Sequence, residues 1–167
     1  MKTNFKQRLH SISCMIFDID GVLTDGSLLI TEEGNMLRSM NIRDGFALEL
    51  AVKKGYHVFI ISGSMSEGVR IRLNRLGITE IHMSIKNKKE CLEQLLKKYS
   101  LALSQVLYMG DDVPDLEVIK IAGVATCPAD AIHDIKKECI YTSEIPGGKG
   151  CVRDVIEQVM RLQEKWE

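Results

Sequence analysis

The sequence lacks the features that mark several large functional classes. Its formal net charge is only -1 at pH 7, so it offers no basic surface for nucleic acid. No apolar run approaches the length of a membrane span, and residues 1–8 lack the apolar region of a signal peptide. We therefore expect no membrane partner, no nucleic-acid partner and a cytoplasmic location.

The cysteines also lack the pattern of a metal site or a disulfide framework. They are odd in number and dispersed, and no Cys-x-x-Cys pair occurs. Most stand among apolar neighbours, so we expect reduced thiols in the core. The five are Cys14, Cys91, Cys127, Cys139 and Cys151.

No linker, repeat or low-complexity stretch divides the 167 residues. Hydrophobic residues make up 45% and charged residues 27%, which is typical of a globular chain. The length suits one core, so we expect a single domain over residues 1–167.

The stretch from Met15 to Gly21 organises the chain. Its apolar part, Met15 to Phe17, is too short for a helix and predicts a buried strand. Asp18 and Asp20 follow, and residues i and i+2 of an extended chain point the same way. Neighbouring carboxylates repel each other unless a cation or a proton intervenes. The pair indicates either a site for a hard divalent cation or a solvated turn.

Strand-like and helix-like segments alternate along the chain, which predicts a parallel sheet covered on both faces. The fold class is therefore α/β, a Rossmann-like three-layer sandwich. We predict strands at about 12–19, 57–61, 80–83, 106–109, 124–125 and 139–141. We predict helices at about 3–9, 43–54, 66–76, 87–98, 114–121, 129–136 and 151–165.

One insertion follows the first strand. Two strand-like runs, 27–30 and 36–42, flank a polar segment, which predicts a β-hairpin with Gly34-Asn35 as the turn. This hairpin flap, about 27–42, stands where a larger cap domain could be inserted.

Polar residues follow the second predicted strand at Ser62-Gly63. A hydroxyl and free amides where a strand leads into a helix suit a phosphate, although Ser is also an ordinary N-cap residue. In such sheets ligands bind at the carboxyl ends of the strands, so this group and the aspartate pair should converge.

Acidic residues follow the strand at 106–109. Asp111, Asp112 and Asp115 either add ligands to a Mg²⁺ site or begin a helix whose dipole they stabilise. Lys86, Lys88 and Lys89 come before a predicted helix. They could form a solvated face, but one lysine beside the carboxylates would offset their repulsion and could hold a phosphate.

Four short motifs, in this order, resemble those of the haloacid dehalogenase-superfamily phosphatases. Asp18-Ile19-Asp20-Gly21-Val22 is similar to the first motif and Ser62-Gly63 to the second. Lys88 is similar to the third, and Gly110-Asp111-Asp112-Val113-Pro114-Asp115 matches the fourth.

A narrower resemblance, to the 3-deoxy-D-manno-octulosonate 8-phosphate phosphatases, covers nearly the whole chain. It is carried by Asn41-Ile42-Arg43-Asp44-Gly45, Val69 with Arg72, Asn87-Lys88 and Gly147-Gly148-Lys149-Gly150. Ser64 departs from the pattern, because that group tends to carry Arg there and the related nine-carbon keto-acid phosphatases can carry Glu. Lys149 replaces the more usual Arg.

The resemblance implies a mechanism for the first motif. Asp18 would attack phosphorus and form an aspartyl-phosphate. Asp20 would protonate the leaving oxygen and then deprotonate the attacking water. Mg²⁺ would be bound by Asp18, by the backbone carbonyl of Asp20 and by Asp111.

The resemblance also implies roles around this centre. Ser62, Gly63 and Lys88 would hold the phosphoryl oxygens. Asp112 and Asp115 would orient Lys88 or metal-bound waters.

The implied substrate is a keto-acid sugar phosphate, which carries a carboxylate as well as a phosphate. Arg43 and Arg72 are the candidate carboxylate ligands. We expect the eight-carbon 8-phosphate to be preferred over its nine-carbon analogue, which stays the alternative.

A hairpin alone cannot enclose a sugar phosphate, and catalysis favours excluded water. The resemblance implies a homotetramer in which a neighbouring subunit supplies the cover. Two non-enzymatic alternatives are a phospho-accepting signalling domain and an oligomerisation domain. The aspartate pair after the first strand argues against the former, and the full set of motif residues against the latter.

Overall fold

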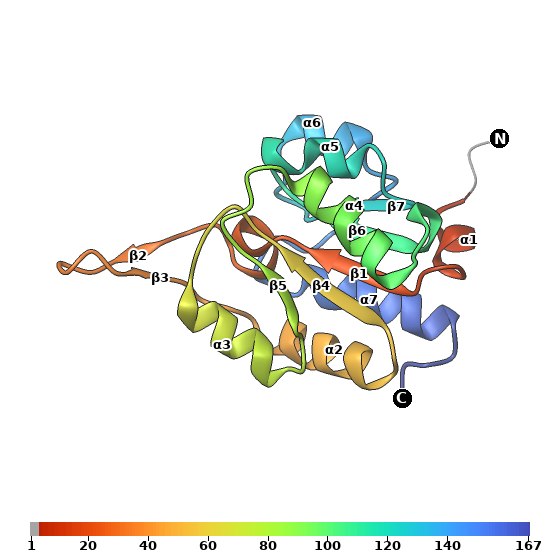
Figure 1. Cartoon of the computed structure of the whole chain (residues 1–167), viewed down its shortest axis with the longest axis horizontal. Helices are drawn as coiled ribbons and strands as arrows, with labels where there is room; N and C mark the ends of the chain where they lie inside the picture. The colour runs from red at the N-terminus through yellow and green to blue at the C-terminus, as the bar shows by residue number, and fades with distance from the viewer. Residues whose placement is uncertain (1–3) are drawn as a thin grey trace.

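A computed structural model describes residues 4–167 (Figure 1). Its central sheet has six strands in the order β5-β4-β1-β6-β7-β8, and every neighbouring pair is parallel. The strands are β1 Cys14–Phe17, β4 His57–Ile61, β5 Glu80–His82, β6 Val106–Met109, β7 Val124–Cys127 and β8 Tyr141–Thr142. The predicted α/β fold with a central parallel sheet is confirmed.

Side chains of β1 enter two cores alternately. Met15 and Phe17 lie in one cluster, whereas Cys14 and Ile16 lie in the other. All four are fully buried, because helices cover both faces of the sheet (Figure 1). One core includes residues of α2 Ile42–Lys53, α3 Glu67–Arg75 and α7 Cys151–Leu162, and the other those of α4 Lys88–Tyr99, α5 Leu116–Ile119 and α6 His133–Glu138.

Several boundaries differ from the predicted ones. The lead-in helix α1 is Phe5–Leu9, and the part of the prediction at residue 3 lies outside the described residues. The helix predicted at 114–121 is a 3₁₀ turn over Val113–Asp115 followed by α5. The helix predicted at 129–136 begins only at His133. Backbone groups ahead of it bond to other loops, because the amide of Ile132 donates to the carbonyl of Asp111 at 3.0 Å.

The hairpin is present but shorter than predicted. Its strands β2 Leu29–Ile30 and β3 Met36–Leu37 are antiparallel. The turn is wider than the predicted Gly34-Asn35, because residues 31–35 form the loop and Thr31 donates its amide to the carbonyl of Asn35 at 3.0 Å. Figure 1 shows the hairpin extending away from the sheet.

All five cysteines are free, and four of them are buried. Among residues 4–167, no helix has both the length and the apolar character needed to cross a bilayer.

Candidate active site

Loops at the carboxyl ends of β1, β4 and β6 meet in a cavity of about 280 Å³. The structure therefore brings together most of the residues that the sequence singled out. Those lining the cavity are Asp18, Asp20, Ser62, Gly63, Lys88, Asp111 and Asp112, with Gly21, Gly26, Ser64 and Pro114.

Asp18 stands directly after β1 and is almost wholly buried. Its amide continues the strand ladder by donating to the carbonyl of Met109 at 3.1 Å. One carboxylate oxygen accepts the amide of Ile19 at 2.6 Å, and the other lies 2.8 Å from Lys88 Nζ. Burial and the Asp115 carboxylate raise the pKa of Asp18 to about 6, although Lys88 opposes this.

Lys88 bridges two carboxylates from the first residue of α4. Asn87 caps this helix by accepting the amide of Glu90 at 3.0 Å. The Lys88 side chain is buried, and its ammonium also lies 2.7 Å from Asp115 Oδ1. Burial opposes the charge, but Asp18 and Asp115 together raise the pKa of Lys88 above its usual value. The lysine is thus a fixed cation, not part of a solvated face.

Asp115 is a carboxylate whose hydrogen bonds hold its neighbours in the site in position. It is completely buried, and Tyr108 donates its hydroxyl to Asp115 Oδ1 at 2.5 Å. Its second oxygen accepts the amides of Asp111 at 3.1 Å and Asp112 at 3.4 Å. Because both oxygens already have partners, Asp115 holds Lys88 and the Asp111 loop in place.

Asp111 carries a carboxylate oxygen, Oδ1, that is buried without a hydrogen-bond partner. Burial, followed by the charges of Asp115 and Asp18, raises the pKa of Asp111 to about 8. Carboxylate oxygens of Asp18, Asp111 and Asp115 lie within 4.8 Å of one another. Buried carboxylates this close, with one oxygen unpaired, fit a divalent cation.

Gly21 makes this packing possible. Its φ is +86°, a conformation that favours glycine. A Cβ at this position would lie 2.0 Å from Asp111 Oδ2, so any side chain would displace the carboxylate.

Asp20 lines the cavity but pairs with a residue that the sequence reasoning missed. Its oxygens accept from Arg38 Nε at 2.7 Å and Arg38 Nη2 at 3.2 Å. Burial acts against the charge, but Arg38 and Ser64 hold the pKa of Asp20 below its usual value. Arg38 comes from the end of the hairpin, and no sequence motif marks it.

Ser62 is not the N-cap of the following helix. That position belongs to Ser66, whose hydroxyl accepts the amide of Val69 at 3.4 Å. Ser62 is buried instead, and its hydroxyl lies 3.1 Å from that of Ser64 in the cavity wall. The hydroxyl also accepts the amide of Ser64 at 3.3 Å, so it lines the cavity and takes no part in helix capping.

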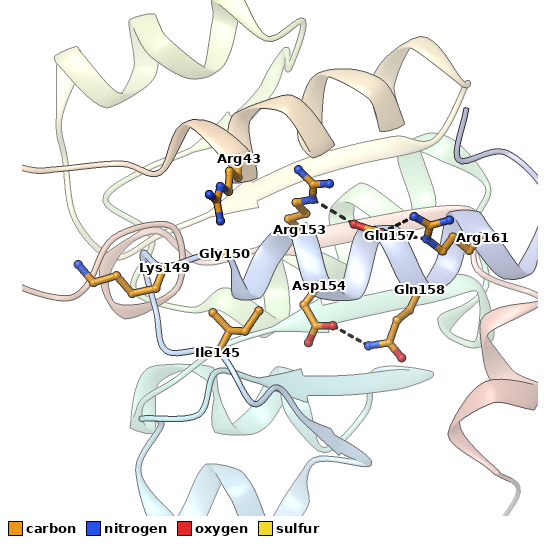
Figure 2. A pocket seen from close by; sticks show the side chains of 9 residues that line it. All are labelled: Arg43, Ile145, Lys149, Gly150, Arg153, Asp154, Glu157, Gln158 and Arg161. Atoms are coloured by element: carbon orange, nitrogen blue, oxygen red, sulfur yellow. Dashed lines mark hydrogen bonds and ion pairs between the residues drawn. The ribbon is translucent and has the colours of Figure 1, made fainter.

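Arg43 and Arg72 do not line the aspartate cavity. Arg43 lines a separate groove of about 550 Å³ between α2 and α7, with Lys149 toward the same end and Arg161 at the other (Figure 2). Arg72 lines a cavity of about 830 Å³ beside the hairpin, together with Arg38. Within one chain, the two arginines therefore face different spaces.

Comparison with known proteins agrees with this geometry. The sequence profile of the haloacid dehalogenase-like hydrolases matches residues 66–146. The chain is 34% identical over 158 residues to the 3-deoxy-D-manno-octulosonate 8-phosphate phosphatase of Escherichia coli K12. The aligned region covers 95% of this chain and 84% of that protein.

Solved structures of phosphatases are also similar to this chain. The Yersinia pestis phosphatase of that name is 32% identical, with a TM-score of 0.94 over 96% of this chain and 87% of that one. The Moraxella catarrhalis phosphatase, in complex with magnesium ion, phosphate ion and a KDO molecule, is 30% identical. Its TM-score is 0.94 over 97% of this chain and 93% of that one. The chain therefore belongs to the haloacid dehalogenase-superfamily phosphatases and resembles, among them, the 3-deoxy-D-manno-octulosonate 8-phosphate phosphatases.

Proposed function

We propose that this protein is a Mg²⁺-dependent phosphomonoester hydrolase that acts on 3-deoxy-D-manno-octulosonate 8-phosphate through an aspartyl-phosphate. The observation that carries the proposal is the contact of Asp18 with Lys88, at 2.8 Å, beside the unpaired oxygen of Asp111. A carboxylate nucleophile, a fixed cation and a place for a metal ion thus meet at one strand end.

The residues present fit the metal. Asp18, the backbone carbonyl of Asp20, and Asp111 would bind Mg²⁺, a hard cation that prefers oxygen ligands. The unpaired Asp111 oxygen would gain a partner. When bound, the ion neutralises negative charge on the nucleophile and the phosphate, which would otherwise repel each other.

The chain's own residues then divide the reaction between them. The Asp18 carboxylate attacks phosphorus, and the bond to the sugar oxygen breaks. Asp20 in its protonated form donates a proton to that oxygen, and as the resulting carboxylate it later accepts one from the water that hydrolyses the aspartyl-phosphate. Lys88, Ser62 and the amides beside Gly63 hold the phosphoryl oxygens while their charge increases.

The substrate assignment rests on likeness to phosphatases of the eight-carbon sugar acid. A nine-carbon keto-acid 9-phosphate stays the alternative, because Ser64 matches neither group. In a purified-enzyme assay with Mg²⁺, we expect the highest kcat/KM on the eight-carbon phosphate among a panel of sugar phosphates. A clearly higher value on the nine-carbon phosphate would overturn the substrate ranking. No phosphate release from any member would overturn the phosphatase proposal.

We also propose that the chain works as a cytoplasmic homotetramer. Apolar side chains of the hairpin are exposed to solvent, among them Leu29 at 68% and Ile30 at 63%. A second copy that covers them would bury this surface and could close the site. Light scattering should report four chains per particle, and a fully active monomer would contradict the shared cover.

A further inference from the structure

Arg38 is a buried cation at the base of an exposed hairpin. Its side chain is only 4% exposed although the residue as a whole is half-buried, and the preceding strand residues Met36 and Leu37 are exposed. An arginine at this depth is rare unless a partner holds it. Here the partner is Asp20, the proposed acid and base of the reaction.

The contact engages both carboxylate oxygens of Asp20. Arg38 Nε donates to one carboxylate oxygen at 2.7 Å, and Nη2 to the other at 3.2 Å. The third guanidinium nitrogen donates to the carbonyl of Met36 at 3.2 Å. This is a two-bond fork, the strongest arrangement of a guanidinium on a carboxylate. While it lasts, both Asp20 oxygens are bound to Arg38, which fixes the carboxylate in one orientation.

Arg38 also faces a second space. It lines the 830 Å³ cavity beside the hairpin, and Arg72 lines the same cavity. Among the residues that the structure describes, no hydrogen bond or ion pair engages the Arg72 guanidinium. Gly45 leaves room for it, because a Cβ there would lie 2.6 Å from Arg72 Nη2. This cavity therefore holds one unpaired cation and one that is paired with Asp20.

The two cavities are neighbours. Ser64 lines the aspartate cavity, and the next residue, Met65, lines the cavity beside the hairpin. The Asp20–Arg38 pair also joins the two cavities, because Asp20 lines the first and Arg38 lines the second. A ligand with a phosphate in the first cavity could thus extend an anionic tail toward Arg38 and Arg72.

We propose that Arg38 exchanges partners: without substrate it holds Asp20, and a sugar acid draws it onto the substrate carboxylate and so frees Asp20. The inference rests on the proposed function and deepens it. One carboxylate replaces another on the guanidinium, so the exchange leaves no buried cation unpaired. A phosphate ester without a carboxylate offers no such exchange, so Asp20 stays engaged. Arg38 is accordingly a positioning residue for Asp20 and a specificity residue for acidic substrates.

The first test compares Arg38→Met, which keeps the length and removes the charge, with Arg38→Lys and with the control Arg75→Met. Arg75 is exposed on α3, in neither cavity. Hydrogen bonds to charged groups contribute about 1.5–3 kcal/mol, so Arg38→Met should raise KM for the keto-acid phosphate on the order of 10–150-fold. The kcat on p-nitrophenyl phosphate should rise, because Asp20 is then free to deprotonate the water that hydrolyses the aspartyl-phosphate. Arg38→Lys should recover part of the KM loss, and Arg75→Met should match the wild type.

The second test does not depend on turnover. In a crystal structure of Asp18→Asn with the keto-acid phosphate, Arg38 should contact the substrate carboxylate and no longer Asp20. Arg38 still paired with Asp20 in that complex, or an unchanged KM in Arg38→Met, would overturn the exchange alone. A wild type that neither binds nor hydrolyses sugar phosphates would overturn the proposed function and the exchange with it.

Discussion

Two of the charge-rich hollows of this molecule, the aspartate cavity and the groove of Figure 2, differ in how their charges are held. In the aspartate cavity, Lys88 and Asp115 have side chains only 3% and 0% exposed, and their contacts join segments 27 residues apart. In the groove of Figure 2, Arg153 and Arg161 are 36% and 61% exposed, and both pair with Glu157 one turn away on the same helix.

The groove is about twice the size of the aspartate cavity, at 550 Å³ against 280 Å³. The volume of a hollow therefore does not indicate which of the two is the candidate active site. Exposed pairs along one helix are screened by water and contribute little, whereas buried charges need exact partners and are costly to keep. A fold keeps buried like charges together only where an opposite charge compensates them. In the aspartate cavity, Lys88 compensates the buried carboxylates of Asp18 and Asp115.

The largest expected effect is that of Asp18→Asn. The change removes the nucleophile with little change in volume, so phosphate release should fall below detection. Mg²⁺ binding, measured by calorimetry, should be partly retained because Asp111 and the Asp20 carbonyl are unchanged. Wild-type turnover by this variant would contradict the assignment of Asp18 as the nucleophile.

Asp20→Asn should lower kcat by about 10²–10⁴-fold, the usual contribution of a general acid and base. The loss should be smaller on p-nitrophenyl phosphate, whose leaving group needs no proton. Steady-state kinetics on both substrates checks this. Equal losses would count against protonation of the leaving group by Asp20.

Mg²⁺ affinity should depend on pH more steeply than an ordinary carboxylate site would. Because the pKa of Asp111 is raised to about 8 in the metal-free chain, protons compete with the ion at neutral pH. Affinity should fall as the pH is lowered from about 8.5 to 6.5, by up to about tenfold per unit for one displaced proton. Calorimetry in buffers of different ionisation enthalpy would count that proton, and a flat profile would contradict the cation site.

Asp44, a buried residue of α2, should make stability depend on pH. Its carboxylate accepts the amide of Arg153 at 2.8 Å, near the start of α7, yet burial raises its pKa to about 6. A raised carboxyl pKa stabilises the fold fully below the unfolded value near 4. This stability is lost as the pH rises through about 6.

The corresponding experiment is urea unfolding between pH 4 and 8 at saturating Mg²⁺. The wild type should lose about 2–3 kcal/mol relative to Asp44→Asn over this range, given about 1.4 kcal/mol per unit of pKa shift. Parallel stability curves for the two proteins would show that Asp44 does not titrate in this way.

The smallest expected effect belongs to the groove. Glu157→Gln breaks the pairs with Arg153 and Arg161, at 3.0 Å and 2.7 Å. Both arginines also lie over the ring of Trp166 and stay partly solvated. The free energy of unfolding should change by no more than about 0.5 kcal/mol, and kcat should not change. A loss comparable to that of Asp20→Asn would mean that the groove takes part in the reaction.

Much of this molecule could be predicted from the sequence because local rules act alike everywhere in such folds. The apolar run Met15 to Phe17 forms a strand whichever helices cover it, and parallel strands bring their carboxyl ends to one edge. Asp18, Ser62, Lys88 and Asp111 therefore line one cavity, as the spacing of their motifs indicates.

Only the tertiary structure decided which charged side chains pair with one another. Asp20 and Arg38 are 18 residues apart, and their contact depends on where a two-stranded hairpin with exposed side chains returns to the sheet. Register is weakly specified by sequence when neither face of a hairpin is buried, so no pattern could reveal that pair. The same holds for Arg43 and Arg72, which the folded chain places in separate hollows. The sequence by itself determined which strands end in the residues of the site. Packing determined which charges pair, because a long charged side chain reaches whichever opposite charge the fold leaves buried beside it.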